Sequence, residues 1–244
     1  MKYLNWQYDE STEYWAKRLL IPIKSKHPEP QYDGLDYRLR EKTWKKHILK
    51  DSFPAYCHYP NQEGSLLCSP SNIIRCYRDQ RVLEGLALTV AWGRMTRSKG
   101  NIYQESNQII EETLQKCLRL IEKTNSVKDS WNLLVRRLHW SYVITSKCLH
   151  FLARSLSYSI NPPVPIDNRV IINRVWHTFE EMVTNNFKAS TEIFPEEWWD
   201  DAVSWNAYNR YMTAINCWAS QKDWTTTQIE NTIFQEYYPN GKAT

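Results

Sequence analysis

The sequence predicts an all-helical fold, and three observations favour it. Apolar residues recur at the i, i+3, i+4 spacing of helices along most of the chain. Glycine is scarce, at 6 of 244 residues, and sustained alternation of β-branched residues is hard to find. A chain of this length can bury a full core, either as one compact unit or as two small lobes that share a cleft.

Chemical signals mark the ends of several predicted helices. Ser69-Pro70 is an N-cap followed by proline at the first helical position, and Ser126-x-x-Asp129 resembles a capping box. Residues 52–69 carry two Pro and one Gly and receive no element. The predicted helices run over 10–20, 36–50, 70–78, 81–92, 104–123, 127–139, 146–157, 168–186, 195–220 and 226–237.

Charge and aromatic content restrict the class of protein. The net charge is +4, from 31 Lys and Arg against 27 Asp and Glu, which excludes a histone-like polycation. Basic residues nevertheless cluster in 38–50 and again at Arg94, Arg97 and Lys99. Such patches suit phosphate contacts, and a solvated helix face is the alternative. The 12 Trp and 15 Tyr serve mainly the core, but they can also stack on extruded bases.

The cysteines and the N-terminus point to a soluble cytoplasmic protein. Six scattered cysteines form no C-x-x-C pair and no cluster with metal-ligand spacing, so we expect reduced thiols and neither a metal nor another cofactor. The N-terminus lacks an apolar signal region, and no stretch approaches the roughly 18 apolar residues of a membrane span. We therefore expect no contact with a membrane.

The chemistry concentrates in residues 140–176. Helices 127–139 and 146–157 are predicted to form a short helix–turn–helix pair, and a proline-rich loop, 158–166, then delivers Asp167 to the start of a new helix. Lys147 lies near the start of helix 146–157 between apolar neighbours, which favours a lowered pKa. Taken singly, Asp167 is most simply an N-cap and Lys147 a surface lysine.

Two motifs in this segment resemble the helix-hairpin-helix DNA glycosylases, and most closely their 8-oxoguanine DNA glycosylase branch. They are Thr145-Ser146-Lys147 and Val164-Pro165-Ile166-Asp167-Asn168-Arg169-Val170, with 20 residues from the lysine to the aspartate. The resemblance implies that Lys147 attacks the anomeric carbon and that Asp167 stabilises the oxocarbenium-like transition state, an arrangement that favours the transition state over the ground state.

The resemblance also implies an architecture. We expect one helix-hairpin-helix unit over 1–244, in which two helical lobes surround a cleft. The central lobe, 81–186, would hold the hairpin and the catalytic loop, and residues 1–80 with 187–244 would form the second lobe.

Contacts with DNA follow by the same resemblance. The loop 93–101 would reach into the duplex, where Arg94 or Met95 would fill the gap left by the flipped base. The predicted hairpin turn, 142–145, contains none of the glycines with which the family approaches a phosphate. The expected DNA contacts are Arg94, Met95, Arg97, Lys99, Thr145, Ser146 and Arg169, and the expected base-binding residues are Phe151, Trp198, Trp199 and Tyr208.

The predicted function is that of a monomeric DNA glycosylase acting on double-stranded DNA. It would flip and excise an oxidised purine such as 8-oxoguanine, and a Schiff base on Lys147 would permit AP-lyase activity. Two alternatives stay open: a glycosylase for modified bases of foreign DNA in host defence, and a non-enzymatic helix-hairpin-helix module that binds DNA.

Overall fold

The computed structural model describes residues 3–27, 37–40, 65–93, 102–158, 161–167, 174–187 and 204–237. Helices dominate these residues, which confirms the predicted all-helical class. The helices are α1 Glu10–Arg18, α3 Pro70–Arg78, α4 Val82–Trp92, α6 Asn107–Thr124, α7 Lys128–Leu138, α8 Tyr142–Ser155, α9 His177–Phe187, α10 Trp205–Lys222 and α11 Thr226–Tyr237.

One small antiparallel ribbon corrects the prediction for residues 36–50. Strand β1, Tyr37–Arg40, pairs with β2, Ser65–Cys68, in the register Tyr37↔Cys68 to Arg40↔Ser65. The helix predicted over 36–50 is therefore wrong at its start, because a ladder with a distant strand outweighs the local helical spacing. Residues 41–50 lie outside the described part of the chain.

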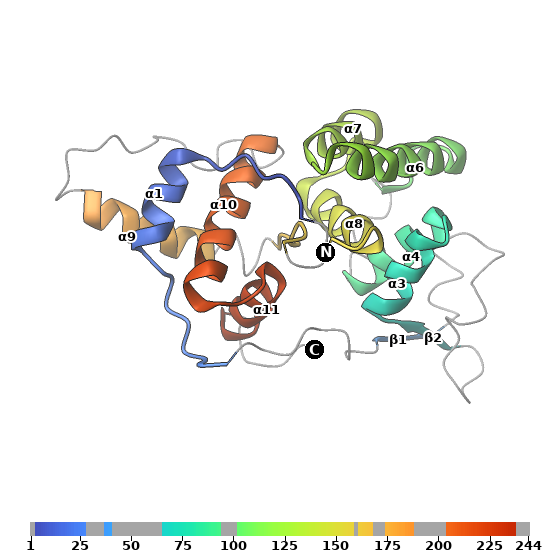
Figure 1. The fold of residues 1–244 in the computed structure, drawn as a ribbon. Helices are drawn as coiled ribbons and strands as arrows, with labels where there is room; N and C mark the ends of the chain where they lie inside the picture. Colours follow the sequence, from blue (N-terminus) through green and yellow to red (C-terminus); the bar gives the residue numbers. More distant parts are fainter. Residues whose placement is uncertain are drawn as a thin grey trace.

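The described helices form two groups that face each other across loop 161–167 (Figure 1). The α8 group contains α3, α4, α6, α7 and α8, in which α3 packs on both α4 and α8. The α10 group contains α1, α9, α10 and α11; α1 packs along α10, and the ring of Phe179 on α9 meets Trp218 on α10 edge-on at 5.2 Å. The predicted boundaries at 81 and 186 would assign α3 to the second lobe and α9 to the central lobe. In the structure α3 packs within the α8 group, and α9 contacts α10.

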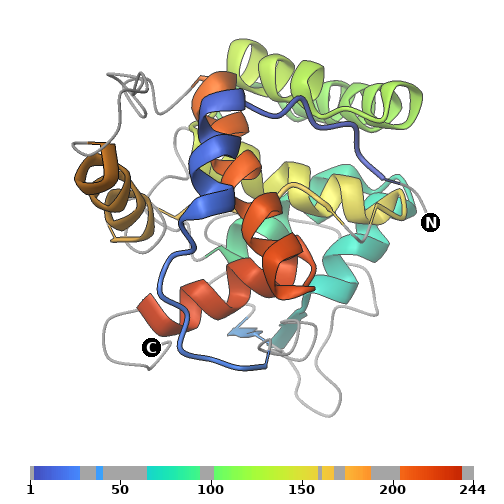
Figure 2. The same cartoon turned by 60° about the vertical axis from the view of Figure 1, so that its left-hand side comes forward.

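Aromatic side chains join the two groups. Trp131 on α7 stacks on Tyr208 of α10 with ring centroids 4.3 Å apart. Trp205, at the start of α10, stacks in turn on Trp6 at 6.1 Å. Trp6 belongs to the N-terminal segment that crosses from the α6–α7 side to α1 (Figure 2). Much of the high aromatic content therefore packs in the core, as its burial shows.

The ends of the helices follow their capping residues. Ser69 caps α3 through the Asn72 N–H, as predicted, and Ser204 caps α10 through the Ala207 N–H. The predicted capping box at Ser126 and Asp129 is wrong: the Ser126 hydroxyl accepts from the Lys128 N–H, and α7 begins without a side-chain cap.

Helix α8 begins at Tyr142, four residues before its predicted start at 146, so the hairpin turn is 139–141 and not 142–145. In this turn His139 adopts the left-handed conformation, with φ 53°. Glycine is the residue that adopts this conformation without strain. The hairpin position that favours glycine is therefore occupied by an exposed histidine.

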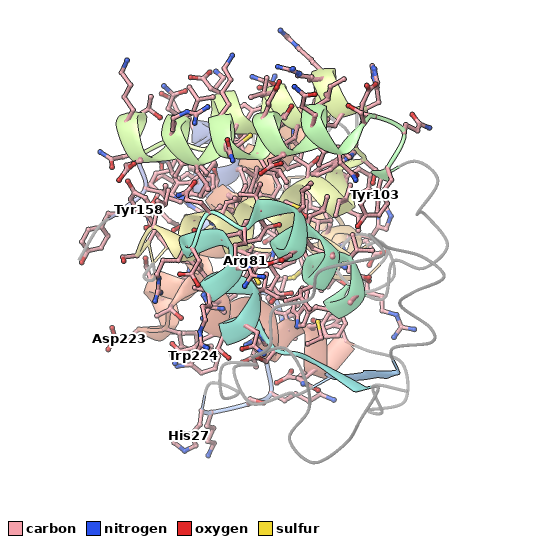
Figure 3. The ribbon with its side chains drawn as sticks, turned by 90° about the vertical axis from the view of Figure 1, so that its right-hand side faces the viewer. His27, Arg81, Tyr103, Tyr158, Asp223 and Trp224 are labelled. Atoms are coloured by element: carbon pink, nitrogen blue, oxygen red, sulfur yellow. The ribbon has the colours of Figure 1, made fainter. Side chains whose placement is uncertain are left out.

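The exposed face of α6 is polar. Figure 3 shows the side chains of α6 extending away from the body of the protein. Among the described helices, none is long and apolar enough to cross a membrane.

Candidate active site

The loop 161–167 is held by hydrogen bonds along its backbone. The Ile166 N–H donates to the Ser146 hydroxyl at 3.0 Å, and the Val164 carbonyl accepts from the Tyr208 hydroxyl at 3.0 Å. The Pro163 carbonyl binds the His150 ring at 2.7 Å, and the Pro162 carbonyl accepts from Thr226 of α11 at 3.4 Å. These partners come from α8, α10 and α11, so both helix groups fix the position of Asp167 at the end of the loop.

At the start of the loop, Asn161 binds the segment that precedes α1, at Leu4 and Trp6. Its side chain accepts from the Leu4 N–H and donates to the Leu4 carbonyl, both at 3.1 Å, and its carbonyl accepts from the Trp6 indole at 3.1 Å. Buried backbone groups need such partners, because an unpaired one costs about 1–3 kcal/mol. The sequence of three prolines alone does not reveal this network.

Ser146 and His150 share one face of α8, since they are four residues apart. Burial and, to a smaller extent, the charge of Arg154 lower the pKa of His150 to about 3, against the opposing effect of the bond to Pro163. The ring is therefore neutral near pH 7: its Nδ1–H donates to Pro163, and Nε2 faces Arg154 at 3.4 Å. The residue holds loop 161–167 through this bond and carries no charge.

Lys147 is buried in the second turn of α8, with 7% of its surface exposed. Its Nζ lies 3.5 Å from the Gly93 carbonyl and 5.9 Å from the centre of the Trp92 ring. Burial lowers the pKa of this amine below its ordinary value, and the charges of Asp167 and Glu230 partly oppose that shift. The apolar surroundings predicted for Lys147 are present. The predicted help from the helix N-terminus is small, because Lys147 lies beyond the first turn.

Asp167 ends the clamped loop and is half-buried. Its charge raises the pKa of Lys147, so the two groups lie within electrostatic reach of each other. The structure thus brings together the predicted catalytic pair. Residues 168–173 are outside the described residues. They include Arg169 and the start of the helix predicted after Asp167.

Glu230 on α11 is a third titratable group in this site, and it was not among the residues predicted from the sequence. It is 8% exposed. Burial, together with the charge of Asp167, raises the pKa of its carboxyl group to about 8, although the charge of Lys147 acts to lower it. A signal was available: Thr226, Glu230 and Ile233 lie on one helix face, so the spacing of α11 turns this glutamate toward the core.

Tyr211 on α10 completes the polar groups of the site. The side chain is fully buried, and within the described part of the chain its hydroxyl has no hydrogen-bond partner. Burial raises the pKa of this hydroxyl, and the charges of Glu230 and Asp167 raise it further. The hydroxyl is therefore a neutral donor beside two carboxyl groups.

Four other predicted site residues are buried against protein atoms. Phe151 is 0% exposed and meets Trp92 edge-on, and Tyr208 is 1% exposed under Trp131. Neither offers an open face on which a base could stack. Thr145 and Ser146 are also fully buried, so we reassign Ser146 from a DNA contact to the clamp on Ile166.

The remaining predicted residues, Arg94, Met95, Arg97, Lys99, Trp198 and Trp199, lie outside the described residues. Among the described residues, no group of three or more His, Cys, Asp or Glu could hold a metal ion. The described cysteines, Cys68, Cys76, Cys117, Cys148 and Cys217, are buried thiols outside any disulfide.

A comparison with protein-family models matches residues 34–234 to the family described as "Putative 8-oxoguanine DNA glycosylase OGG-like protein". The match spans most of the chain and includes Lys147, Asp167 and Glu230. No curated protein and no solved structure matched the chain in the corresponding comparisons.

Proposed function

The chain belongs to the OGG-like 8-oxoguanine DNA glycosylase family, and from this premise we propose that it excises an oxidised purine from double-stranded DNA with Lys147 as nucleophile. The observation that carries the proposal is a buried lysine of lowered pKa within electrostatic reach of Asp167, which a clamped loop holds in place. A lysine attacks carbon only as the neutral amine, and burial favours that form.

The two residues have separate roles in the proposed reaction. The Lys147 amine attacks C1′ of the damaged nucleotide, the bond from C1′ to the base breaks, and its electron pair leaves with the base. Positive charge develops on the sugar as this bond stretches. The Asp167 carboxylate, held by the loop, stabilises that charge in the proposed reaction.

The adduct then accounts for a second activity. The adduct nitrogen loses one proton, its lone pair then displaces O4′ from C1′, and O4′ takes up a proton as the sugar ring opens. Loss of the remaining proton from nitrogen leaves an imine that joins Lys147 to C1′. This Schiff base permits cleavage of the DNA strand and is the species that borohydride reduces. Lyase activity therefore belongs to the same proposal.

The same premise extends to DNA binding. We propose that Arg94, Met95, Arg97, Lys99 and Arg169 contact the duplex and that Trp198 or Trp199 stacks on the base, as the family resemblance implies. The burial of Lys147 favours the enzyme over a module that only binds DNA, because burying an ammonium group is costly and a phosphate contact would require an exposed one.

The test is borohydride trapping on duplexes that carry 8-oxoguanine or an abasic site. The parent should form a covalent protein–DNA conjugate on both duplexes, whereas Lys147→Gln should form none and should still bind the DNA. Lys116→Gln, which alters an exposed lysine of α6, is the matched control and should trap like the parent. Asp167→Asn should bind and lose nearly all base release, since an amide cannot balance the charge on the sugar.

One result would contradict the assignment of Lys147. If the parent releases the base without ever cross-linking, and Lys147→Gln releases it equally fast, then the enzyme is a monofunctional glycosylase in which Asp167 activates water.

A further inference from the structure

Departure of the base requires a group that the proposed pair does not supply. When the bond to C1′ breaks, the electron pair moves onto the base, and a proton or hydrogen bond to the base stabilises it. Lys147 must be neutral to attack, and Asp167 balances the positive sugar. Neither of them is available as an acid toward the leaving group.

Glu230 is a buried carboxyl group that interacts with both members of the proposed pair. Its helix, α11, is fixed to loop 161–167, because the hydroxyl of Thr226, the first residue of α11, donates to the Pro162 carbonyl. The carboxyl group lies within electrostatic reach of both Lys147 and Asp167, and it keeps an exposed fraction of 8%, close to the 7% of Lys147. Lys147 and Glu230 therefore reach the same site from α8 and α11.

Tyr211 provides an independent observation. Its buried hydroxyl lacks a hydrogen-bond partner among the described residues, and the charges of Asp167 and Glu230 act on it electrostatically. A buried hydroxyl without a partner is costly in a folded protein and points to a group that binds there. The unpartnered hydroxyl and the buried carboxyl group come from adjacent helices, α10 and α11, which pack on each other.

We propose that Glu230, in its protonated form, is the acid that gives a proton to the departing base, and that the Tyr211 hydroxyl donates a second hydrogen bond to the same base. This inference rests on the proposed glycosylase function. In the first step Lys147 bonds to C1′, the bond from C1′ to the base breaks, and the base takes the electron pair together with the Glu230 proton. In the second step the Glu230 carboxylate removes a proton from the positively charged nitrogen of the adduct, which restores the acid.

The electrostatics agree with a protonated Glu230. Burial and the charge of Asp167 raise the pKa of its carboxyl group to about 8 despite the opposing charge of Lys147. The described titratable groups that interact with Glu230 are Lys147 on α8, Asp167 in the loop, and Tyr208 and Tyr211 on α10. Both tyrosine pKa values are raised, so the tyrosines stay neutral at the pH near 8 where Glu230 loses its proton.

The experiment compares base release with abasic trapping in Glu230→Gln. Base release needs the leaving-group proton, so the variant should lose about 10²-fold or more in its single-turnover rate. The parent rate should fall above about pH 8, where Glu230 ionises, and that alkaline decline should be absent in the variant. Abasic DNA has no base to expel, so borohydride trapping on it should persist in the variant and should lose far less of its rate than base release does.

A control on the same helix isolates the effect of position. Glu236→Gln removes a carboxylate of α11 that binds the Lys24 and Ser25 N–H groups away from the site, and it should keep the parent rate and pH profile. Tyr211→Phe should slow base release and leave abasic trapping intact. If the parent traps abasic DNA while Glu230→Gln releases base with the rate and pH profile of the parent, this inference is overturned and the glycosylase proposal stands. A parent that traps no abasic DNA would instead overturn the lysine chemistry on which both depend.

Discussion

Replacing Ser146 with Ala should loosen the loop that carries Asp167. The Ser146 hydroxyl accepts from the Ile166 N–H at 3.0 Å and donates to the Val143 carbonyl within α8. Both Ser146 and Ile166 are fully buried, so alanine would leave the Ile166 N–H without water or any other acceptor in its place. An orphaned buried donor of this kind costs about 1–3 kcal/mol of unfolding free energy.

That loss is measurable by thermal unfolding. For a chain of this size each kcal/mol corresponds to about 2–4 °C, so the midpoint should fall by about 2–12 °C. Ser155→Ala is the matched control, because Ser155 is also buried on α8 and donates to a carbonyl three residues earlier, without reaching the loop. The two variants differ in the bond to Ile166.

Activity should follow the loss of stability, because Asp167 directly follows Ile166. A displacement of about 1 Å at a catalytic group can cost about 10²-fold in rate. Single-turnover base release should therefore fall in Ser146→Ala and stay near the parent value in Ser155→Ala. If the two variants unfold at the same temperature and release base at the same rate, the clamp on Asp167 has no role.

Three further predictions concern stability. Burial lowers the pKa of His150 from 6.5 to about 3, so between these pH values the unfolded chain binds a proton that the folded chain does not. The unfolding free energy should therefore fall as the pH drops from about 6.5 toward 3. Urea titrations of His150→Gln should show a shallower fall. His139→Gly should raise the unfolding free energy by about 1 kcal/mol, because glycine adopts the left-handed conformation without strain; no gain in thermal midpoint would argue against strain at the hairpin. Tyr208→Phe removes the donor to the Val164 carbonyl and should lower the unfolding free energy by about 1 kcal/mol, which denaturant titration can measure; a value equal to that of the parent would mean that the bond adds nothing.

Local patterns in the sequence predicted most of the helices, for reasons that the structure makes clear. Helices α3 and α11 have the predicted bounds, and a Ser-Pro cap and a regular apolar face define α3. The start of α8 was predicted four residues late, because Tyr142 to Thr145 are aromatic, β-branched or polar residues of low helix propensity, and tertiary packing overrides that preference.

The candidate site divides in the same way. Lys147 and Asp167 lie in motifs of consecutive residues, so the sequence alone predicted them. Glu230 lies 63 residues after Asp167 and belongs to no motif; its relation to Lys147 depends on the packing of α11 against the loop. The base-binding role predicted for Phe151 and Tyr208 rested on residue type, which does not distinguish an aromatic ring in a pocket from one in the core.

The pairing of α1 with α10 has a consequence for how the protein is made. Three bonds hold α1 against α10: the Asp9 N–H to Thr213, the Gln221 amide to the Ala16 carbonyl and the Trp218 indole to the Leu19 carbonyl, each about 200 residues apart in the chain (Figure 1). Because the chain is synthesised at about 5–20 residues per second, α1 leaves the ribosome about 10–40 seconds before α10 does. The α8 group, whose members follow one another in the chain, can fold during that interval. The N-terminal segment must stay unpaired until α10 emerges, so the candidate site, which draws on both groups, is assembled only after α10 has been made.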